Sequence, residues 1–160
     1  MMQTRSKDHP FVASVKLSES LCFAIYSANL AFVKAYRPIL DELGLTYPQY
    51  VTIIALWERS PQAVGELGAK LLLKNNALTP ILERLQLMGY LDRQRDPKNK
   101  RRVLISLTEN GRQLREKALS ADPARKTGLG LGEVLHIQEV ISKLRTNLER
   151  PRQLTSGMRD

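Results

Sequence analysis

The sequence predicts a mainly α-helical protein with one small β-hairpin. Apolar residues recur at alternating spacings of four and three over residues 21–39, which is the period of an amphipathic helix. Over residues 90–107 the pattern changes to two short strands joined by a turn. With 160 residues, 42% of them hydrophobic, the chain can bury a core, and we expect a single domain over residues 1–160.

The first helix is expected to begin at Ser18 or Glu19 and to end at Gly44, because glycine readily adopts the left-handed conformation that closes a helix. A helix of this length so near a terminus often packs against something besides its own small domain. Its apolar stripe consists of Leu21, Ile25, Ala28, Phe32, Ala35 and Ile39.

Two further helices are expected before residue 73. Thr46 can cap a helix with Pro48 in its first turn. This helix is apolar almost all round, which indicates central burial. A break at residues 60–61 separates it from a short helix over residues 64–72.

The next helix is expected over residues 77–88, with Asn75 or Asn76 as its cap. Pro80 has no amide proton, so we expect it in the first turn, where that donor is not required. Gly89 is expected to end this helix.

A basic hairpin follows, with strands over residues 90–95 and 102–107 and a turn over residues 96–100. Thr108 is expected to cap a further helix, and residues 131–148 have the pattern of a last amphipathic helix.

The chain is strongly basic, because 25 lysines and arginines outnumber 16 acidic residues and leave a formal net charge of +9. Such an excess favours a polyanionic partner, of which nucleic acid is the commonest, although a solvated basic surface is the alternative. No stretch approaches the roughly 20 apolar residues that cross a bilayer, and residues 1–10 lack the apolar core of a secretion signal. One unpaired cysteine fits the reducing cytoplasm, where we expect the protein, without a membrane partner.

A helix, a short helix, a capped helix and a basic hairpin are the elements of a winged helix-turn-helix, here over about residues 46–108. The capped helix would enter the major groove of DNA, where asparagine can pair bidentately with adenine. The hairpin would bind phosphates and place an arginine in the minor groove, although its charge can also serve solubility alone. The predicted DNA-binding residues are Asn75, Asn76, Ala77 and Thr79 on the helix, and Arg93, Arg95, Lys98, Lys100, Arg101 and Arg102 on the hairpin.

Several short segments, in this order and spacing, resemble the MarR-type bacterial regulators over about residues 18–150. They are Leu45-Thr46-Tyr47-Pro48-Gln49-Tyr50, Leu78-Thr79-Pro80, Asp96-Pro97 and Arg101-Arg102-Val103-Leu104-Ile105-Ser106-Leu107-Thr108. Leu21-Cys22-Phe23, Tyr26 and Tyr36-Arg37-Pro38 narrow the resemblance to the organic-hydroperoxide repressors, the OhrR branch, of the single-cysteine type. The resemblance implies a homodimer built from the helices at about 18–45 and 131–150. It also implies binding to an inverted-repeat operator in double-stranded DNA, and release upon oxidation.

Two departures from this branch lie at the DNA surface. The branch usually has an acidic residue, a serine and a glycine before the recognition-helix threonine, where this chain has Lys74-Asn75-Asn76-Ala77. It also usually has an aspartate at the wing position held here by Asn99. Both changes remove negative charge, so they leave the operator sequence and the target genes open.

Cys22 is the only cysteine, so it is either a small packed residue or a reactive sensor. Tyr36 lies 14 residues later in the same expected helix, a rise of about 21 Å at 1.5 Å per residue. If the Tyr36 hydroxyl meets the thiol, it must therefore come from a partner subunit. The resemblance implies that role for Tyr36 and Tyr47, with an organic hydroperoxide as the oxidant.

The sequence leaves two alternatives to this redox sensor. In the first, a small lipophilic or aromatic ligand binds below Tyr36 and Tyr47, and Cys22 is passive. In the second, the chain is a thiol peroxidase, which the absence of a resolving cysteine and the basic hairpin disfavour. His9 and His136 are isolated, so we expect no metal site, no cofactor and no enzymatic activity.

Overall fold

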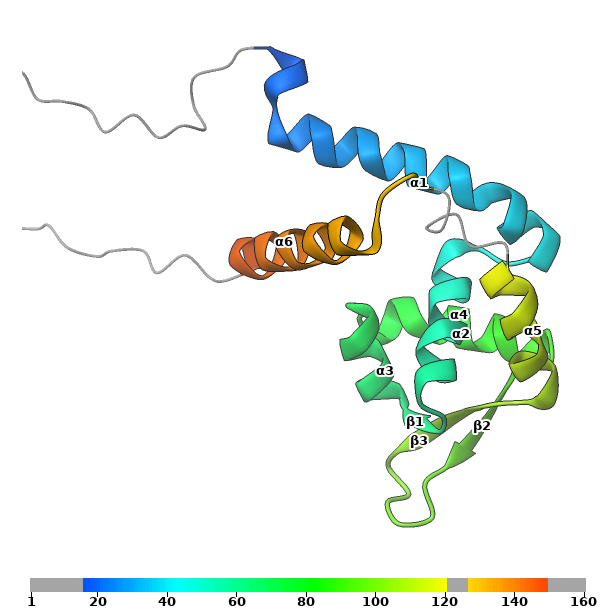
Figure 1. The fold of residues 1–160 in the computed structure, drawn as a ribbon. Coiled ribbons are helices and arrows are strands. Elements are labelled where there is room, and N and C mark those ends of the chain that lie inside the picture. Colours follow the sequence, from blue (N-terminus) through cyan, green and yellow to red (C-terminus); the bar gives the residue numbers. More distant parts are fainter. Residues whose placement is uncertain (1–15, 121–126, 150–160) are drawn as a thin grey trace, which may run out of the picture. The chain divides into compact units, whose positions relative to one another are not determined.

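The computed structural model describes residues 16–120 and 127–149, and within them the fold is mainly helical (Figure 1). It forms two compact units, divided between residues 123 and 124, and each is described by itself. No helix of the described residues is both long and apolar enough to cross a membrane. The elements are a 3-10 turn η1 (Leu17–Glu19), α1 (Leu21–Leu43), α2 (Tyr47–Glu58), β1 (Gln62–Ala63), α3 (Val64–Leu71), α4 (Asn75–Leu87), β2 (Leu91–Arg95), β3 (Val103–Leu107), α5 (Glu109–Ser120) and α6 (Leu131–Glu149).

Helix α1 begins later than the sequence predicted. Ser18 and Glu19 belong to the 3-10 turn, and Ser20 is the cap, its hydroxyl accepting from the Phe23 amide at 3.4 Å. The predicted end is confirmed: Gly44 has a φ of 66°, and the amide after it donates to the Leu40 carbonyl at 2.9 Å.

Helix α2 forms the centre of the first unit, as predicted. The Thr46 hydroxyl accepts from the Gln49 amide at 3.4 Å, and the Gln49 side chain accepts from the Thr46 amide at 2.9 Å. This reciprocal pair satisfies two backbone donors that the first turn of a helix leaves free. Ile53 and Leu56 are fully buried among apolar residues of α3, α4 and the sheet.

The beginning of α4 corrects two predictions. Neither asparagine is the cap: Lys74 holds that position without a side-chain hydrogen bond, and Asn75 is already the first helical residue. Pro80 is consequently the sixth residue and not part of the first turn. The proline removes the hydrogen bond to the Asn76 carbonyl, and the exposure of Asn76 lets water take that place.

The turn between α3 and α4 depends on a glycine. A Cβ on Gly68 would lie 2.9 Å from the Leu73 carbonyl oxygen, so a larger residue would force the two helices apart. This close approach sets the position of α4 relative to α3.

The sheet has three antiparallel strands in the order β1-β3-β2. The sequence predicted β2 and β3 but not β1, which is only two residues long. Gln62 of β1 is buried, and its side chain donates to the Ala55 carbonyl at 2.6 Å. The turn between β2 and β3 projects beyond the helices of this unit (Figure 1). We call β2, β3 and their turn the wing.

Helix α5 is capped by Thr108, as predicted. Its hydroxyl accepts from the Gly111 amide at 3.1 Å and donates to the Gly89 carbonyl at 2.6 Å. Further along α5, Lys117 forms an ion pair with Glu42 of α1 at 3.0 Å. These contacts connect α5 to the end of α4 and to α1.

Within the described residues of each unit, much of the apolar surface of α1 and of α6 is not covered. Only Ile39 and Leu43 of α1 are buried, and α6 has no buried residue. The exposed large apolar side chains are Leu21, Ile25, Tyr26, Leu30, Phe32 and Val33 on α1, and Leu131, Leu135, Ile137, Val140, Ile141 and Leu148 on α6. Large exposed apolar side chains at this density along a helix indicate an interaction surface.

Candidate nucleic-acid interface and thiol site

The predicted base-reading residues lie at the beginning of α4. Asn75, Asn76 and Ala77 are exposed in its first turn. Thr79 is half-buried, and its hydroxyl donates to the Asn75 carbonyl at 2.8 Å. The two asparagine side chains are therefore the most accessible polar groups of this set.

The tip of the wing is ordered by two short polar side chains. Asp96 accepts from the Lys98 amide at 2.9 Å, and Asn99 accepts from the Arg101 amide at 3.1 Å. Such side-chain bonds to an amide two residues later stabilise a turn. An aspartate makes the same bond, so Asn99 preserves the turn while it removes one negative charge from the wing.

The six basic residues predicted on the wing fall into two groups. Arg102 pairs with Glu66 at 2.8 Å and with Asp96 at 4.0 Å, and Arg93 approaches Glu83 at 3.9 Å. The other four are exposed and have no ion pair within the described residues: Arg95, Lys98, Lys100 and Arg101. Sequence reasoning could not separate the groups, because both glutamates come from other elements.

Glu66 of α3 is a residue that sequence reasoning missed. Its carboxylate accepts from Arg59 at 2.9 Å, from Arg102 at 2.8 Å and from the Ala63 amide at 3.4 Å. The Ala63 hydrogen bond, followed by the charges of Arg59 and Arg102, lowers the pKa of Glu66 against the opposing effect of desolvation. Glu66 thus connects α3 to the point where the turn of the wing joins β3.

Cys22 is the second residue of α1 and is exposed. Helix α1 is continuous from Leu21 to Leu43, so the 14 residues between Cys22 and Tyr36 correspond to a rise of about 21 Å. The thiol and the tyrosine are therefore far apart within one chain, as the sequence predicted.

Tyr36 and Tyr47 lie together in an aromatic cluster where α1 meets α2. Their ring centroids are 5.4 Å apart with the rings nearly perpendicular, at 78°. Tyr50 completes the cluster, with centroids 5.8 Å from Tyr36 and 6.4 Å from Tyr47. Sequence reasoning missed Tyr50, although its spacing of three from Tyr47 on α2 was a usable signal. Tyr50 is buried, Tyr36 is half-buried, and Tyr47 is 47% exposed.

Comparison with known proteins identifies the family. A family model described as "Transcriptional regulator SarA/Rot" matches residues 34–118. The chain is 39% identical over 135 residues to the organic hydroperoxide resistance transcriptional regulator of Bacillus subtilis (strain 168), with 84% of this chain and 91% of that protein covered. The chain belongs to the MarR-like SarA/Rot family of transcriptional regulators. The relatives are regulators and not enzymes.

Solved structures agree with this assignment. Reduced AbfR bound to DNA has a TM-score of 0.71 and 34% identity, with 84% of this chain and 95% of that chain covered. A disulfide-formed AbfR has a TM-score of 0.63 and 34% identity, with 83% and 90% covered. The predicted winged-helix fold is confirmed, and the protein is a DNA-binding transcriptional regulator. The individual DNA-contacting residues and the redox role of Cys22 stay predictions.

Proposed function

We propose that this protein is a homodimeric repressor that binds an inverted-repeat operator and releases it when an organic hydroperoxide oxidises Cys22. The observation that carries the proposal is the arrangement of one exposed thiol at the beginning of α1 and a tyrosine cluster whose Tyr36 lies about 21 Å further along the same helix. A partner chain is needed to bring the two together.

The proposed dimer uses the exposed apolar residues of α1 and α6. Covering these faces in a second chain would stabilise the assembly through the hydrophobic effect. The helices at about 18–45 and 131–150 would then complete a single domain with the winged helix-turn-helix at about 46–108. Two copies of α4 would lie about one DNA turn apart, roughly 34–36 Å, and would read an inverted repeat.

The proposed chemistry begins with the Cys22 thiolate attacking one oxygen of the peroxide. An S–O bond forms to the terminal oxygen and the O–O bond breaks, so the sulfur is oxidised to a sulfenic acid. The alkoxide half of the hydroperoxide leaves and takes up a proton to become an alcohol. Hydroxyls of the partner's Tyr36 and Tyr47 would donate hydrogen bonds that stabilise the thiolate. Phe23 and Phe32 on α1 provide an apolar approach suited to lipid-like or aryl peroxides.

The fate of the oxidised sulfur is restricted by the sequence. The chain has one cysteine, so a disulfide with a second cysteine of the same chain cannot form. The sulfenic acid would instead react with a small thiol, close to a sulfenamide with a backbone nitrogen, or oxidise further. Each product changes the size and hydrogen bonding of a group at the proposed dimer interface. The spacing of the two α4 helices would change with it.

A DNA-shift assay with the reduced protein tests the proposal. Duplexes selected from a random pool by the reduced protein supply the operator. Cumene hydroperoxide should release the wild-type protein from this duplex but not the Cys22→Ser variant, which differs by one atom. Retention of wild-type protein after quantitative oxidation of Cys22 would refute the redox mechanism, while the shift itself would still report DNA binding.

The same assay distinguishes release by oxidation from release by a small ligand. The cluster of Tyr36, Tyr47 and Tyr50 offers an aromatic surface, with Tyr47 47% exposed, that a small lipophilic ligand can contact. Such a ligand should release wild-type protein and Cys22→Ser equally, without a peroxide.

A further inference from the structure

Asn75 and Asn76 are neighbours in the first turn of α4, but they lie on different sides of the helix. The fully buried Leu78, Leu82 and Leu85 mark the side of α4 that packs in the core. At about 100° per residue, Asn76 lies about 150° from the middle of this side, and Asn75 lies only about 55° from it. Asn76 is therefore on the outward side of α4, nearly opposite the core.

The side chain of Asn75 is turned back towards α3. Its amide oxygen lies 3.7 Å from the position that a Cβ on Gly68 would occupy. Thr79 is half-buried, and its hydroxyl proton is already donated to the Asn75 carbonyl at 2.8 Å. Ala77 has no polar side-chain atom. Of the four residues of α4 that the sequence predicted to contact bases, Asn76 is therefore the polar residue placed on the outward side.

Pro80 lies one turn after Asn76 on the same outward side and is exposed. It is about 165° from the middle of the buried side, and its ring offers apolar atoms there. The rise between the two residues is about 6 Å at 1.5 Å per residue, and successive bases of one DNA strand are about 3.4 Å apart. Asn76 and Pro80 can thus contact base pairs that are separated by no more than about two steps.

The first two turns of α4 are electrically neutral. Between Asn75 and Leu82 no side chain is charged, and the carboxylate of the next residue, Glu83, is approached by Arg93 of β2 at 3.9 Å. The salt-dependent attraction of phosphates depends on lysines and arginines, so this surface contributes little to it. It is suited instead to base edges, where hydrogen bonds and apolar contacts carry the sequence information.

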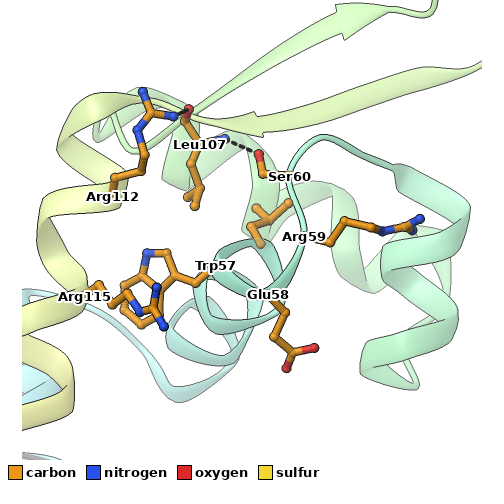
Figure 2. A pocket seen from close by; sticks show the side chains of 8 residues that line it. Trp57, Glu58, Arg59, Ser60, Leu107, Arg112 and Arg115 are labelled. Atoms are coloured by element: carbon orange, nitrogen blue, oxygen red, sulfur yellow. Dashed lines mark hydrogen bonds between the residues drawn. The ribbon is translucent and has the colours of Figure 1, made fainter.

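The elements around α4 are joined by hydrogen bonds at Leu107 of β3. Its amide donates to the Ser60 hydroxyl at 3.0 Å and its carbonyl accepts from Arg112 at 2.9 Å, as Figure 2 shows beside the pocket between α2, β3 and α5. These bonds connect the end of α2 and the beginning of α5 to the sheet. The buried side of α4 packs in the same core as Leu56 of α2 and Leu107. A rigid framework therefore presents the outward side of α4, as recognition by hydrogen-bond geometry requires.

We propose that Asn76 determines the operator preference by reading an adenine in the major groove, while Pro80 contacts the methyl group of a thymine within about two base pairs of it. The inference rests on the DNA binding of the proposed function and is independent of the oxidation of Cys22. The Asn76 side chain donates from Nδ2 to the adenine N7 and accepts at Oδ1 from the N6 amino group. Guanine presents two acceptors at these positions, so its O6 would face Oδ1 without a proton between them.

Selection of duplexes from a random pool tests the assignment. The full-length Cys22→Ser protein is the parent, so that no oxidation occurs, and it is compared with the same protein carrying Asn76→Ala or Asn75→Ala. The parent should select one fixed adenine in each half-site and prefer it about tenfold or more over other bases. Asn76→Ala should lose this preference at that position alone, and Asn75→Ala, the matched control, should keep it.

A fixed adenine retained by Asn76→Ala with native circular dichroism, or lost only by Asn75→Ala, overturns the proposal. Selection by the parent without a fixed adenine also overturns it, but leaves operator binding intact. A parent that selects no duplex at all contradicts the proposed function together with this role of Asn76.

Modified bases in one half-site then test the individual contacts. 7-Deazaadenine at the selected position removes the N7 acceptor and keeps the pairing with thymine. It should weaken binding of the parent about tenfold and leave Asn76→Ala unaffected. Uracil in place of the neighbouring thymine removes one methyl group, which should cost the parent about fourfold and Pro80→Ser much less. Equal binding of the parent to adenine and 7-deazaadenine duplexes overturns the role of Asn76, and equal binding to thymine and uracil duplexes overturns that of Pro80.

Discussion

Replacing Arg101 and replacing Arg102 by glutamine should affect DNA binding differently, although the two residues are neighbours in the wing. Arg101 is exposed and has no ion pair within the described residues, so its guanidinium is available to a DNA phosphate. Arg102 is held by Glu66 at 2.8 Å and Asp96 at 4.0 Å. Its charge is already offset by two carboxylates of the protein.

The size of the effect follows from counterion release. Each phosphate neutralised by the protein contributes about 0.9 to the slope of log K against log salt concentration. A dimer has two wings, so Arg101→Gln should reduce the magnitude of this slope by about 1.8. Arg102→Gln should reduce it by less than half as much, because the Arg102 guanidinium is held by Glu66 and Asp96 and is not free to neutralise a phosphate.

Fluorescence anisotropy with a labelled operator duplex, between about 50 and 200 mM salt, measures both slopes. Arg145→Gln on α6 controls for the change in net charge. Equal slopes for Arg101→Gln and Arg102→Gln, or a larger change for Arg102→Gln, would refute the division of the wing arginines into paired and available groups.

Three further predictions concern stability and are measured by chemical denaturation of the reduced protein. Thr46→Ala should lower the free energy of unfolding by about 1 kcal/mol, because it removes the hydroxyl that caps α2; no change would show that the capping box contributes nothing. Gly111→Ala should cost about 1–3 kcal/mol or more, because its Cβ would lie 2.1 Å from the Tyr90 carbonyl oxygen, whereas the exposed Gly65→Ala has open space and should be tolerated. The pKa of Glu66 is lowered from its ordinary value of 4.5, so its ion pairs stabilise the fold at pH values above 4.5, and this stabilisation is lost as the pH falls through the folded pKa. Glu66→Gln should therefore make the free energy of unfolding less dependent on pH in this acidic range. An unchanged pH dependence would contradict this role.

Local signals in the sequence identified most of the fold. Thr46 and Gly44 act through hydrogen bonds or dihedral angles within a few residues, so their effects could be read from adjacent positions. The start of α4 was placed too late because Pro80 was assumed to need the first turn. Asn76 is exposed, so water can bond to the carbonyl that the proline leaves without a donor. Strand β1 is too short for an alternating pattern and exists through its pairing with β3.

The functional residues could be predicted where their geometry depends on a single element. The separation of Cys22 and Tyr36 follows from the rise of a single helix, and the sequence therefore contained it. The pairing of Arg102 with Glu66 joins residues 36 positions apart on different elements, and no periodicity reports such a contact. Tyr50 joins Tyr36 only through the packing of α2 on α1.

The central claim is that tyrosines of one chain act on the thiol of the other, and mixed dimers test it directly. In the first mixture, a Tyr36→Phe/Tyr47→Phe chain, which keeps Cys22, is paired with a Cys22→Ser chain, which keeps both tyrosines. In the second, a wild-type chain is paired with a chain carrying all three substitutions. Each dimer has one Cys22 and one pair of tyrosines, and differs only in whether they share a chain.

The rate of sulfenic acid formation with cumene hydroperoxide, trapped with dimedone and measured by mass spectrometry, distinguishes the two dimers. The first dimer should oxidise as fast per thiol as the wild-type homodimer, because its tyrosines lie on the partner chain, and the second should oxidise as slowly as the double phenylalanine homodimer. The reverse order, or equal rates in both dimers, would contradict a sensor shared between subunits.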